Sequence, residues 1–460
     1  MPTSRPMARD SALCFLCLSG LLCLLAFCSR AQQPPVDAGE ISRDLLYHPA
    51  RRVDATEQGL LLRAARFTYR FDRASGQWEV HREKNFAAAE ATPAMKSYKS
   101  ARLNAEYRFV ARSTDDEATL EIRRGPEESS KAEHSAPLVL WKRKQLAAAW
   151  LTLLRQDASS LTVEQLARDL EVADPGVTDV TDDGSFLWLA IRHSAGEGEL
   201  GIGTLVRFDL QTNEAKAYQP VALATSSVTH IVAAGGELWL GTLRFSEGTI
   251  YATKGLVRFN PHTGEVRSYL PESSPLIGRV VTALRAERDL LWVATDAGMC
   301  RIALPKEEWT CWRIAPTVRL AAPTPVSNRS GAPPGGRLPP GTYEVRWANA
   351  AFLEVITPDS IEGWMAADDL QDYARRNFES DPYELENPSA GGIAAMRLLE
   401  NPGSDPLTGA QVHRAPLTRV GSPSSDGWQR VRAHVGWISR KDLEVVPVIE
   451  PVSSRTAPPR

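Results

Sequence analysis

Short apolar runs alternate with polar turns through the middle of the chain, and the alternation repeats. Each unit holds a run that begins Val-Thr, a run that contains Leu-Trp, and a run in which Arg precedes an apolar residue. A turn and a fourth short run follow. The Trp residues of successive units, Trp188, Trp239 and Trp292, lie 51 and 53 residues apart. Short runs rich in β-branched and aromatic residues predict strands joined by tight turns, so each unit is predicted to be a four-stranded sheet with its Trp in the core.

A sheet with two apolar faces needs neighbours on both sides. The unit that joins Val177-Thr178, Leu187-Trp188 and Leu205–Asp209 resembles the two-component-regulator type propeller repeat, over roughly residues 177–314. The resemblance implies β-propeller blades. The first two units exceed the usual ~40–45 residues because of insertions at 191–202 and 243–254, which are predicted to project as loops. Three units are too few for a closed ring of at least ~4 blades.

The region before the repeats is predicted to be β-rich and then helical. Residues 40–141 contain alternating runs, and Phe67–Asp72 with Trp78 matches the last hairpin of a degenerate blade. Residues 142–173 form a predicted helical insertion, in which Leu146, Trp150 and Leu153 share one helix face. The predicted propeller repeats then occupy residues 174–315.

The C-terminal region contains a second repeat. Gly-Trp-Met at 363–365 and Gly-Trp-Ile at 436–438 are each followed, at the same spacing, by Asp-Leu. This pattern resembles the bacterial SH3-like (SH3b) domain and implies two small β-barrels, at 316–371 and 394–446. Residues 372–393 are a predicted linker, and residues 447–460 a predicted disordered tail. The predicted fold class is therefore mainly β: a partial or degenerate β-propeller with a helical insertion, plus two SH3-like barrels.

The N-terminus has the pattern of a secretory signal peptide over residues 1–31. Arg5 and Arg9 precede a short apolar run, and Ser29 and Ala31 supply small residues for cleavage. An uncleaved anchor is one alternative. A lipoprotein attached through Cys28 is another, although a large residue precedes that cysteine. No later segment is predicted to span a membrane, so we expect an exported protein.

Composition and cysteine usage agree with export. The 460 residues include 24% charged residues and a net charge of -3, which excludes wholesale disorder and gives no basic excess for nucleic acid. Cys300 and Cys311 are the cysteines outside the predicted signal peptide, and they flank a predicted hairpin turn symmetrically. We predict a structural disulfide between them; a redox-active pair would favour Cys-x-x-Cys spacing.

No pattern predicts a catalytic, cofactor or metal residue. His193 and His230 lack metal-ligand spacing and are predicted to be solvated or hydrogen-bonded. The carboxylates of Asp179, Asp182 and Asp183 precede a glycine, which favours a turn over a calcium loop.

Among the tryptophans, Trp347 and Trp428 are the candidates for an exposed ligand-binding platform, with core packing as the alternative. Trp364 and Trp437, in the repeated Gly-Trp strings, are predicted to be structural.

These features predict an exported bacterial envelope protein that binds or scaffolds rather than catalyses. Propeller loops and paired SH3-like domains would bind peptidoglycan or an envelope protein, gaining avidity from two modules on one chain. One alternative is a periplasmic sensory subunit that acts through a membrane partner. Another is a propeller-based hydrolase or lyase. The sequence leaves the ligand, the number of blades and the oligomeric state open.

Overall fold

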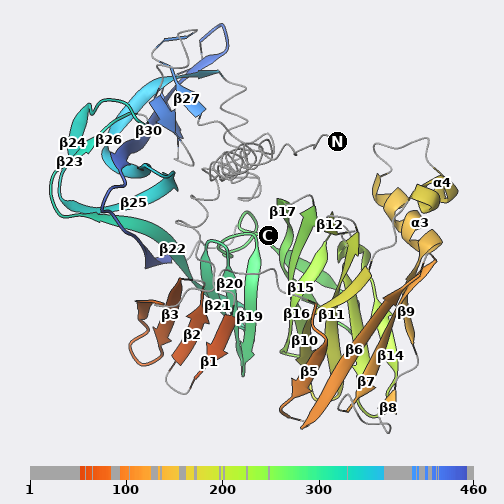
Figure 1. Ribbon diagram of the computed structural model, residues 1–460. Coiled ribbons are helices and arrows are strands. Elements are labelled where there is room, and N and C mark those ends of the chain that lie inside the picture. The colour runs from red at the N-terminus through yellow and green to blue at the C-terminus, as the bar shows by residue number, and fades with distance from the viewer. Residues whose placement is uncertain are drawn as a thin grey trace, which may run out of the picture.

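Figure 1 shows the computed structural model of the chain. It describes residues 52–452 except for the gaps 57–58, 65, 84–93, 103, 115, 126–132, 135–136, 155–161, 170–173, 196–197, 200–201, 224–225, 247–248, 329, 367–395, 400, 403–409, 413–416, 421 and 423. The predicted signal peptide and linker lie outside these residues. The mainly-β class is confirmed, because small antiparallel sheets make up most of the described chain.

Five groups of four main antiparallel strands, here called units 1 to 5, follow one another along the chain. Units 1 to 4 are separate sheets, whereas unit 5 is the beginning of a nine-stranded sheet that continues into the C-terminal region. Units 1 and 2 are formed by β1 (Arg52–Ala55), β2 (Gly59–Arg63), β3 (Phe67–Asp72) and β4 (Trp78–Arg82), then by β5 (Ser97–Ser100), β6 (Ala105–Ser113), β7 (Glu117–Arg124) and β9 (Leu138–Lys142), with the short β8 (Glu133–His134). Unit 3 is formed by β10 (Asp174–Asp182), β11 (Phe186–Ala195), β13 (Thr204–Asp209) and β14 (Ala215–Tyr218), with the short β12 (Gly198–Glu199). Units 4 and 5 are formed by β15 (Ser227–Ala234), β16 (Glu237–Ser246), β17 (Thr249–Phe259) and β18 (Val266–Tyr269), then by β19 (Val281–Glu287), β20 (Leu290–Thr295), β21 (Gly298–Ala303) and β22 (Glu308–Leu320).

The insertion expected as a loop at 243–254 is instead mostly strand. β16 and β17 continue past a register shift near Gly241 and pair from Leu243↔Ala252 to Ser246↔Thr249. The backbone N–H and C=O groups of the insertion thereby form hydrogen bonds with each other, whereas those of an isolated loop would have to bond to water.

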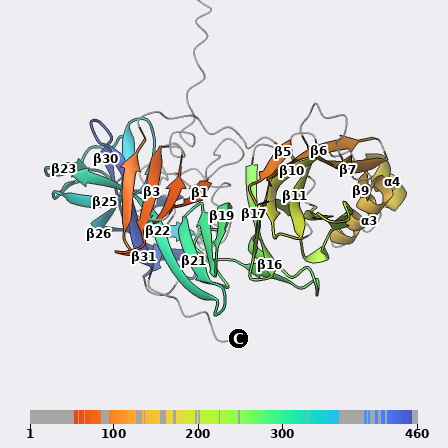
Figure 2. The same cartoon turned by 90° about the horizontal axis from the view of Figure 1, so that it is seen from below.

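Apolar clusters join the units face to face in the order 1-5-4-3-2. The repeated tryptophans lie in these clusters: Trp188 and Trp239 are each 2% exposed, and Trp292 is 3% exposed. Within the described residues, no apolar cluster contains residues of both unit 1 and unit 2. Figure 2 accordingly shows these two units in opposite halves of the molecule. The five sheets form an open arc.

The sheets at the two ends of the arc each have one apolar and one charged face. In unit 1, the cross-strand row Val53–Leu62–Tyr69–Val80 faces unit 5, and the opposite face contains rows of charged residues. In unit 2, the face turned from unit 3 contains the directly opposed pairs Arg108↔Arg123 and Val110↔Glu121. A charged face gains nothing from burial against another sheet, so the stack ends at units 1 and 2.

Two helices follow unit 2, α3 (Arg143–Leu154) and α4 (Val163–Asp169), within the predicted insertion. A capping box begins α4: the backbone N–H of Thr162 donates to Gln165 Oε1 at 2.9 Å, and that of Gln165 donates to Thr162 Oγ1 at 3.2 Å. The side chains of Leu146, Trp150 and Leu153 lie outside the described part. Neither α3, α4 nor any other helix of the described residues is long and apolar enough to cross a membrane.

The two predicted barrels share strands in one C-terminal body. It contains β23 (Thr324–Val326), β24 (Gly336–Leu338), β25 (Gly341–Ala348), β26 (Phe352–Ala366), β27 (Met396–Leu398), β28 (Ala410–Val412), β29 (Leu417–Arg419), β30 (Trp428–Ser439) and β31 (Val445–Val452). β26 and β30 pair along both lengths, from Phe352↔Ser439 to Ala366↔Trp428. One core combines the first half of β26 with the second half of β30, and a second core combines the other halves.

β22 and β31 join the C-terminal body to unit 5. β22 pairs first with β21 and then, from Thr317, with β25, while β31 pairs with its other edge across residues 311–318. Pro316 and Pro447 oppose each other, which costs no hydrogen bond when their nitrogens face away from the shared edge. Residues 445–452, most of which were expected in a disordered tail, are therefore ordered by strand pairing.

Candidate functional site

Trp347 lies half-buried on β25 and packs into the C-terminal body. Its ring meets that of Trp437 at 66° with centroids 5.5 Å apart, and Trp437 is itself 1% exposed. This edge-to-face contact favours the packing alternative for Trp347.

Trp428 lies on the outward face of the β26–β30 ribbon, in a different environment. The register places Trp428 opposite Ala366, Arg430 opposite Trp364, and Arg432 opposite Glu362. Residues that alternate with these, including Met365 and Val431, are buried in the second core. Because cross-strand partners and every second residue share a face, Glu362, Trp364, Trp428, Arg430 and Arg432 form one surface, here called the indole–arginine face.

Charge on this face is organised around Glu362. Arg430 Nη2 and Arg432 Nε each lie 2.8 Å from a carboxylate oxygen of Glu362. The hydrogen bonds from Arg432 hold the pKa of Glu362 below its usual value. Two guanidinium groups on one carboxylate leave a net positive charge, and the side chains of Arg430 and Arg432 remain 50% and 43% exposed.

The backbone behind the face is closely packed, and at Trp364 it is paired on both sides. Trp364 and Leu399 exchange backbone hydrogen bonds of 2.7 and 2.8 Å on the edge of β26 away from β30. A Cβ added at Gly363 would lie 2.6 Å from Leu398 Cβ, so only glycine fits there. At Trp364 both edges of the strand are occupied, so at this position the face offers side chains rather than a free strand edge to a ligand.

The sequence matches no known family, and no curated protein matches it either. The structure is similar to the extracellular domain of a putative hybrid two component system from B. thetaiotaomicron, with 14% identity and a TM-score of 0.27, covering 67% of this chain and 33% of that one. It is also similar to a surface component of the type-IX secretion system of Porphyromonas gingivalis, with 12% identity and a TM-score of 0.25, covering 67% and 43%. The chain thus spans about a third of the length of the first of these structures.

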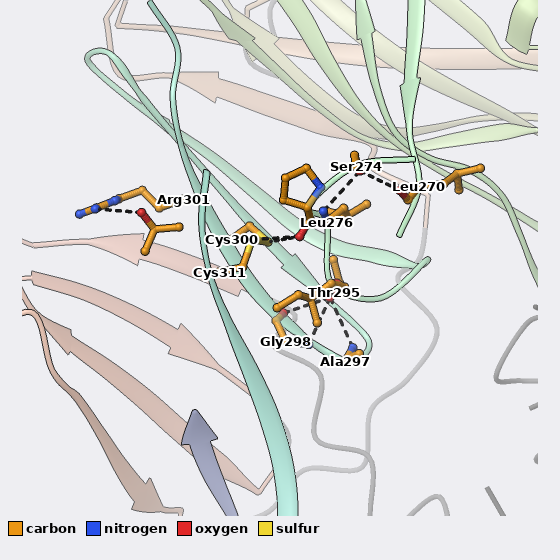
Figure 3. The surroundings of a disulfide bond; sticks show 12 residues. Leu270, Ser274, Leu276, Thr295, Ala297, Gly298, Cys300, Arg301 and Cys311 are labelled. Carbon is orange, nitrogen blue, oxygen red and sulfur yellow. Dashed lines mark hydrogen bonds between the residues drawn. A yellow bond between two sulfur atoms is a disulfide. The ribbon is translucent and has the colours of Figure 1, made fainter. Parts of the chain in front are cut away.

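Cys300 on β21 and Cys311 on β22 are directly opposed and bonded, with an S–S distance of 2.08 Å and Cα atoms 4.1 Å apart (Figure 3). They are 0% and 6% exposed, and the carbonyl oxygen of Pro275 lies 3.3 Å from Cys311 Sγ. A pair enclosed in this way fits a structural bond, because redox exchange requires access for an attacking thiolate.

The three clustered aspartates divide into two roles. Asp182 Oδ1 accepts the backbone N–H of Gly184 at 2.7 Å, and Asp183 Oδ1 accepts that of Ser185 at 2.9 Å. These two carboxylates therefore stabilise the β10–β11 turn. Asp179 lies earlier, on β10 itself. The described residues contain no group of three or more side chains placed to hold a metal ion.

Asp179 and His230 are a polar pair that sequence reasoning missed. Both follow a β-bulge in the first strand of their unit, and the side chains are 30% and 29% exposed. Asp179 Oδ1 accepts the backbone N–H of Val180 at 2.8 Å, and Oδ2 accepts that of Ile231 at 3.0 Å. With both oxygens bonded to backbone, Asp179 connects units 3 and 4. The signal was available as Val-Thr-Asp and Val-Thr-His at the same repeat position.

His193 is buried in a hydrogen-bonded network, which agrees with the prediction that this side chain is solvated or hydrogen-bonded. Trp141 Nε1 donates to His193 Nδ1 at 3.1 Å, so the ring proton is on Nε2, which lies 3.0 Å from Thr204 Oγ1. Burial lowers the pKa of His193 to about 3, which keeps the ring neutral. The network connects units 2 and 3 and leaves neither ring nitrogen for a ligand.

Proposed function

We propose that the protein is an exported envelope binding and scaffold protein, with residues 1–31 as its cleaved leader. In this proposal the five units are blades of an open β-propeller, and the C-terminal body derives from two SH3-like modules that exchange strands. The successive four-stranded meanders and the apolar contacts between them support the first part. The paired Gly-Trp strings on β26 and β30 support the second.

The indole–arginine face is the observation that carries the binding function. Two half-buried indoles with an arginine opposite one of them combine flat apolar area with directed hydrogen-bond donors. Interface hot spots are enriched in these two residue types. We propose cell-wall peptidoglycan as the ligand of this face.

The scaffold function rests on the continuous connection between the two parts. Arg313 on β22 donates to both carboxylate oxygens of Glu344 on β25 at 2.7 and 3.1 Å, and to Glu450 on β31 at 2.9 Å. This ion-pair group joins three strands at the junction. A ligand held by the C-terminal body would therefore have a defined orientation relative to the five sheets, unlike a domain on a flexible linker.

Co-sedimentation of residues 32–460 with purified cell-wall sacculi tests the proposal. We expect saturable pelleting of the wild-type chain, and binding about tenfold weaker for a Trp364→Ala, Trp428→Ala double variant. Trp347→Phe is the matched control, because it retains an aromatic ring against Trp437, and it should pellet like the wild type. Failure of the wild-type chain to pellet would exclude the cell wall as ligand. Equal pelleting of the double variant would exclude the indole–arginine face.

A further inference from the structure

Unit 4 holds a carboxylate that unit 5 supplies. Glu307, in the turn between β21 and β22, places Oε2 3.2 Å from Arg267 Nη1 and Oε1 3.2 Å from the hydroxyl of Tyr269. Arg258 bonds the same carboxylate and also pairs with Glu237 Oε2 at 2.7 Å. Two cations and a phenol thus bind one acidic side chain across the junction between units.

Unit 3 has two cations and a tyrosine at the same positions as unit 4, but no acidic residue occupies the position of Glu307. In unit 3 the row Trp188–Arg207–Lys216 has the register of Trp239–Arg258–Arg267 in unit 4, and Tyr218 corresponds to Tyr269. By the same register, Gly264 of unit 4 occupies the turn position that Glu307 has in unit 5. Phe186 of unit 3 occupies the position that Glu237 has in unit 4. Both acidic partners of the unit 4 arginine are therefore replaced by residues without charge.

The environment of Arg207 reflects this replacement. Its guanidinium carbon lies 4.5 Å from the centroid of the Phe186 ring and 5.9 Å from that of Tyr218, and Lys216 Nζ lies 5.0 Å from the latter. Throughout the described ranges, no carboxylate forms an ion pair with Arg207 or Lys216. A groove of about 460 Å³ opens beside Arg207, between the turns of units 3 and 4; Trp188, Pro261 and His262 also line it.

We propose that this site binds a single carboxylate side chain of a protein partner, as unit 4 binds that of Glu307. The aromatic rings beside the cations lower the local polarity and strengthen a charge-assisted hydrogen bond. This proposal is independent of the cell-wall ligand, because it concerns units 3 and 4 rather than the C-terminal body.

The remaining charges of the groove restrict the partner. Asp182 and Asp183 also line it, although their oxygens accept hydrogen bonds from their own turn, from Ser100 and from Trp188 Nε1. Glu237 is paired with Arg258. These carboxylates disfavour a polyanion, so the site selects an isolated acidic residue flanked by apolar neighbours.

The site can be tested without a partner protein if the acidic side chain is supplied by the chain itself. Gly264 has φ +76° with no atom within 4 Å of an added Cβ, and Glu307 itself adopts φ 50° at the equivalent position. Gly264→Glu therefore places an acid in the site, and Gly264→Gln is its matched control with the same backbone strain. We expect a higher urea midpoint for Gly264→Glu than for Gly264→Gln. The difference should vanish in an Arg207→Gln, Lys216→Gln background. Equal midpoints for the Glu and Gln variants in the wild-type background would overturn the proposal.

Binding of a peptide tests the partner. The probe is acetyl-Gly-Phe-Glu-Phe-Gly-amide, measured by titration calorimetry against its Gln counterpart and against glutarate. We expect the Gln peptide to bind about tenfold more weakly, and Arg207→Gln or Gly264→Glu to weaken the Glu peptide similarly. Arg337→Gln, a remote exposed arginine, should leave binding unchanged. Equal affinity for the Glu and Gln peptides would overturn the carboxylate site, and glutarate binding as tightly as the Glu peptide would overturn the protein partner.

Discussion

Asp179 Oδ2 lies 3.9 Å from His230 Nδ1, so the residues at one repeat position of units 3 and 4 meet across the junction. Burial shifts both groups toward their neutral forms. It raises the pKa of Asp179 to about 6, against the hydrogen bonds from Ile231 and Val180, and it lowers the pKa of His230 to about 4. The two groups therefore contribute opposite pH dependences to stability.

Asp179→Asn should remove one of these dependences. The folded pKa of Asp179 is raised above the unfolded value of about 3.9, so its contribution to stability is lost as pH rises through about 6. Asparagine keeps an acceptor for the Ile231 N–H and does not ionise. We expect the stability of the variant relative to wild type to increase by about 1–2 kcal/mol between pH 4 and pH 7.

Urea unfolding at both pH values measures this change, and Asp209→Asn is the control. Asp209 is a half-buried residue at the end of β13 whose pKa is lowered, mainly by backbone hydrogen bonds from Thr212 and Gln211. A pH-independent difference between Asp179→Asn and wild type would contradict the raised pKa of Asp179.

His193→Ala should destabilise the chain strongly. The substitution leaves Trp141 Nε1 and Thr204 Oγ1 without their partner in a site that is 0% exposed, and it creates a cavity. We expect a loss of about 3–4 kcal/mol at pH 7.

The same variant should alter the acid response. The wild-type contribution of neutral His193 is present above the unfolded pKa of about 6.5 and is lost as pH falls toward about 3. Chemical unfolding from pH 7 to pH 4 measures both effects. His262→Ala, on an exposed turn, should stay within about 0.5 kcal/mol of wild type.

Reduction of Cys300–Cys311 should lower stability without removing a ligand site. The bond closes a short loop, with a sequence separation of 11, so the chain-entropy model gives about 2–3 kcal/mol. The urea midpoint should fall on addition of dithiothreitol. A Cys300→Ala, Cys311→Ala variant should not respond to the reductant, and a wild-type midpoint that is equally insensitive would refute the stabilising role.

A fragment that begins at residue 316 should not fold. The cut falls within β22, and β31 would lose the segment 311–315 of its partner strand. We expect poor dispersion in the proton NMR spectrum of 316–460, and recovery of dispersion in 308–460. A well-dispersed spectrum for 316–460 would show that the C-terminal body is independent of unit 5.

Local sequence patterns predicted the parts of the structure that depend on neighbouring residues. Val-Thr and Leu-Trp runs identified units 3 to 5, since each such sheet pairs strands that follow one another along the chain. Units 1 and 2 were harder to recognise because one face of each is charged, which removes half of the apolar signal. Among the candidate ligand residues, Trp428 lies on an outward face, whereas Trp347 packs against Trp437.

The sequence by itself determined the mainly-β class, the strands of the repeats and the opposed cysteines, because side-chain alternation and turn residues act over a few positions. Only the tertiary structure decided that β30 pairs with β26 and that β31 returns to β22. It also decided that Trp364 joins Trp428 on one face, and that Arg207 lacks the acid that Arg258 has. These features depend on contacts between residues 49 to more than 100 positions apart. Many strand registers bury a similar apolar area, so only the packing of the whole chain selects one of them.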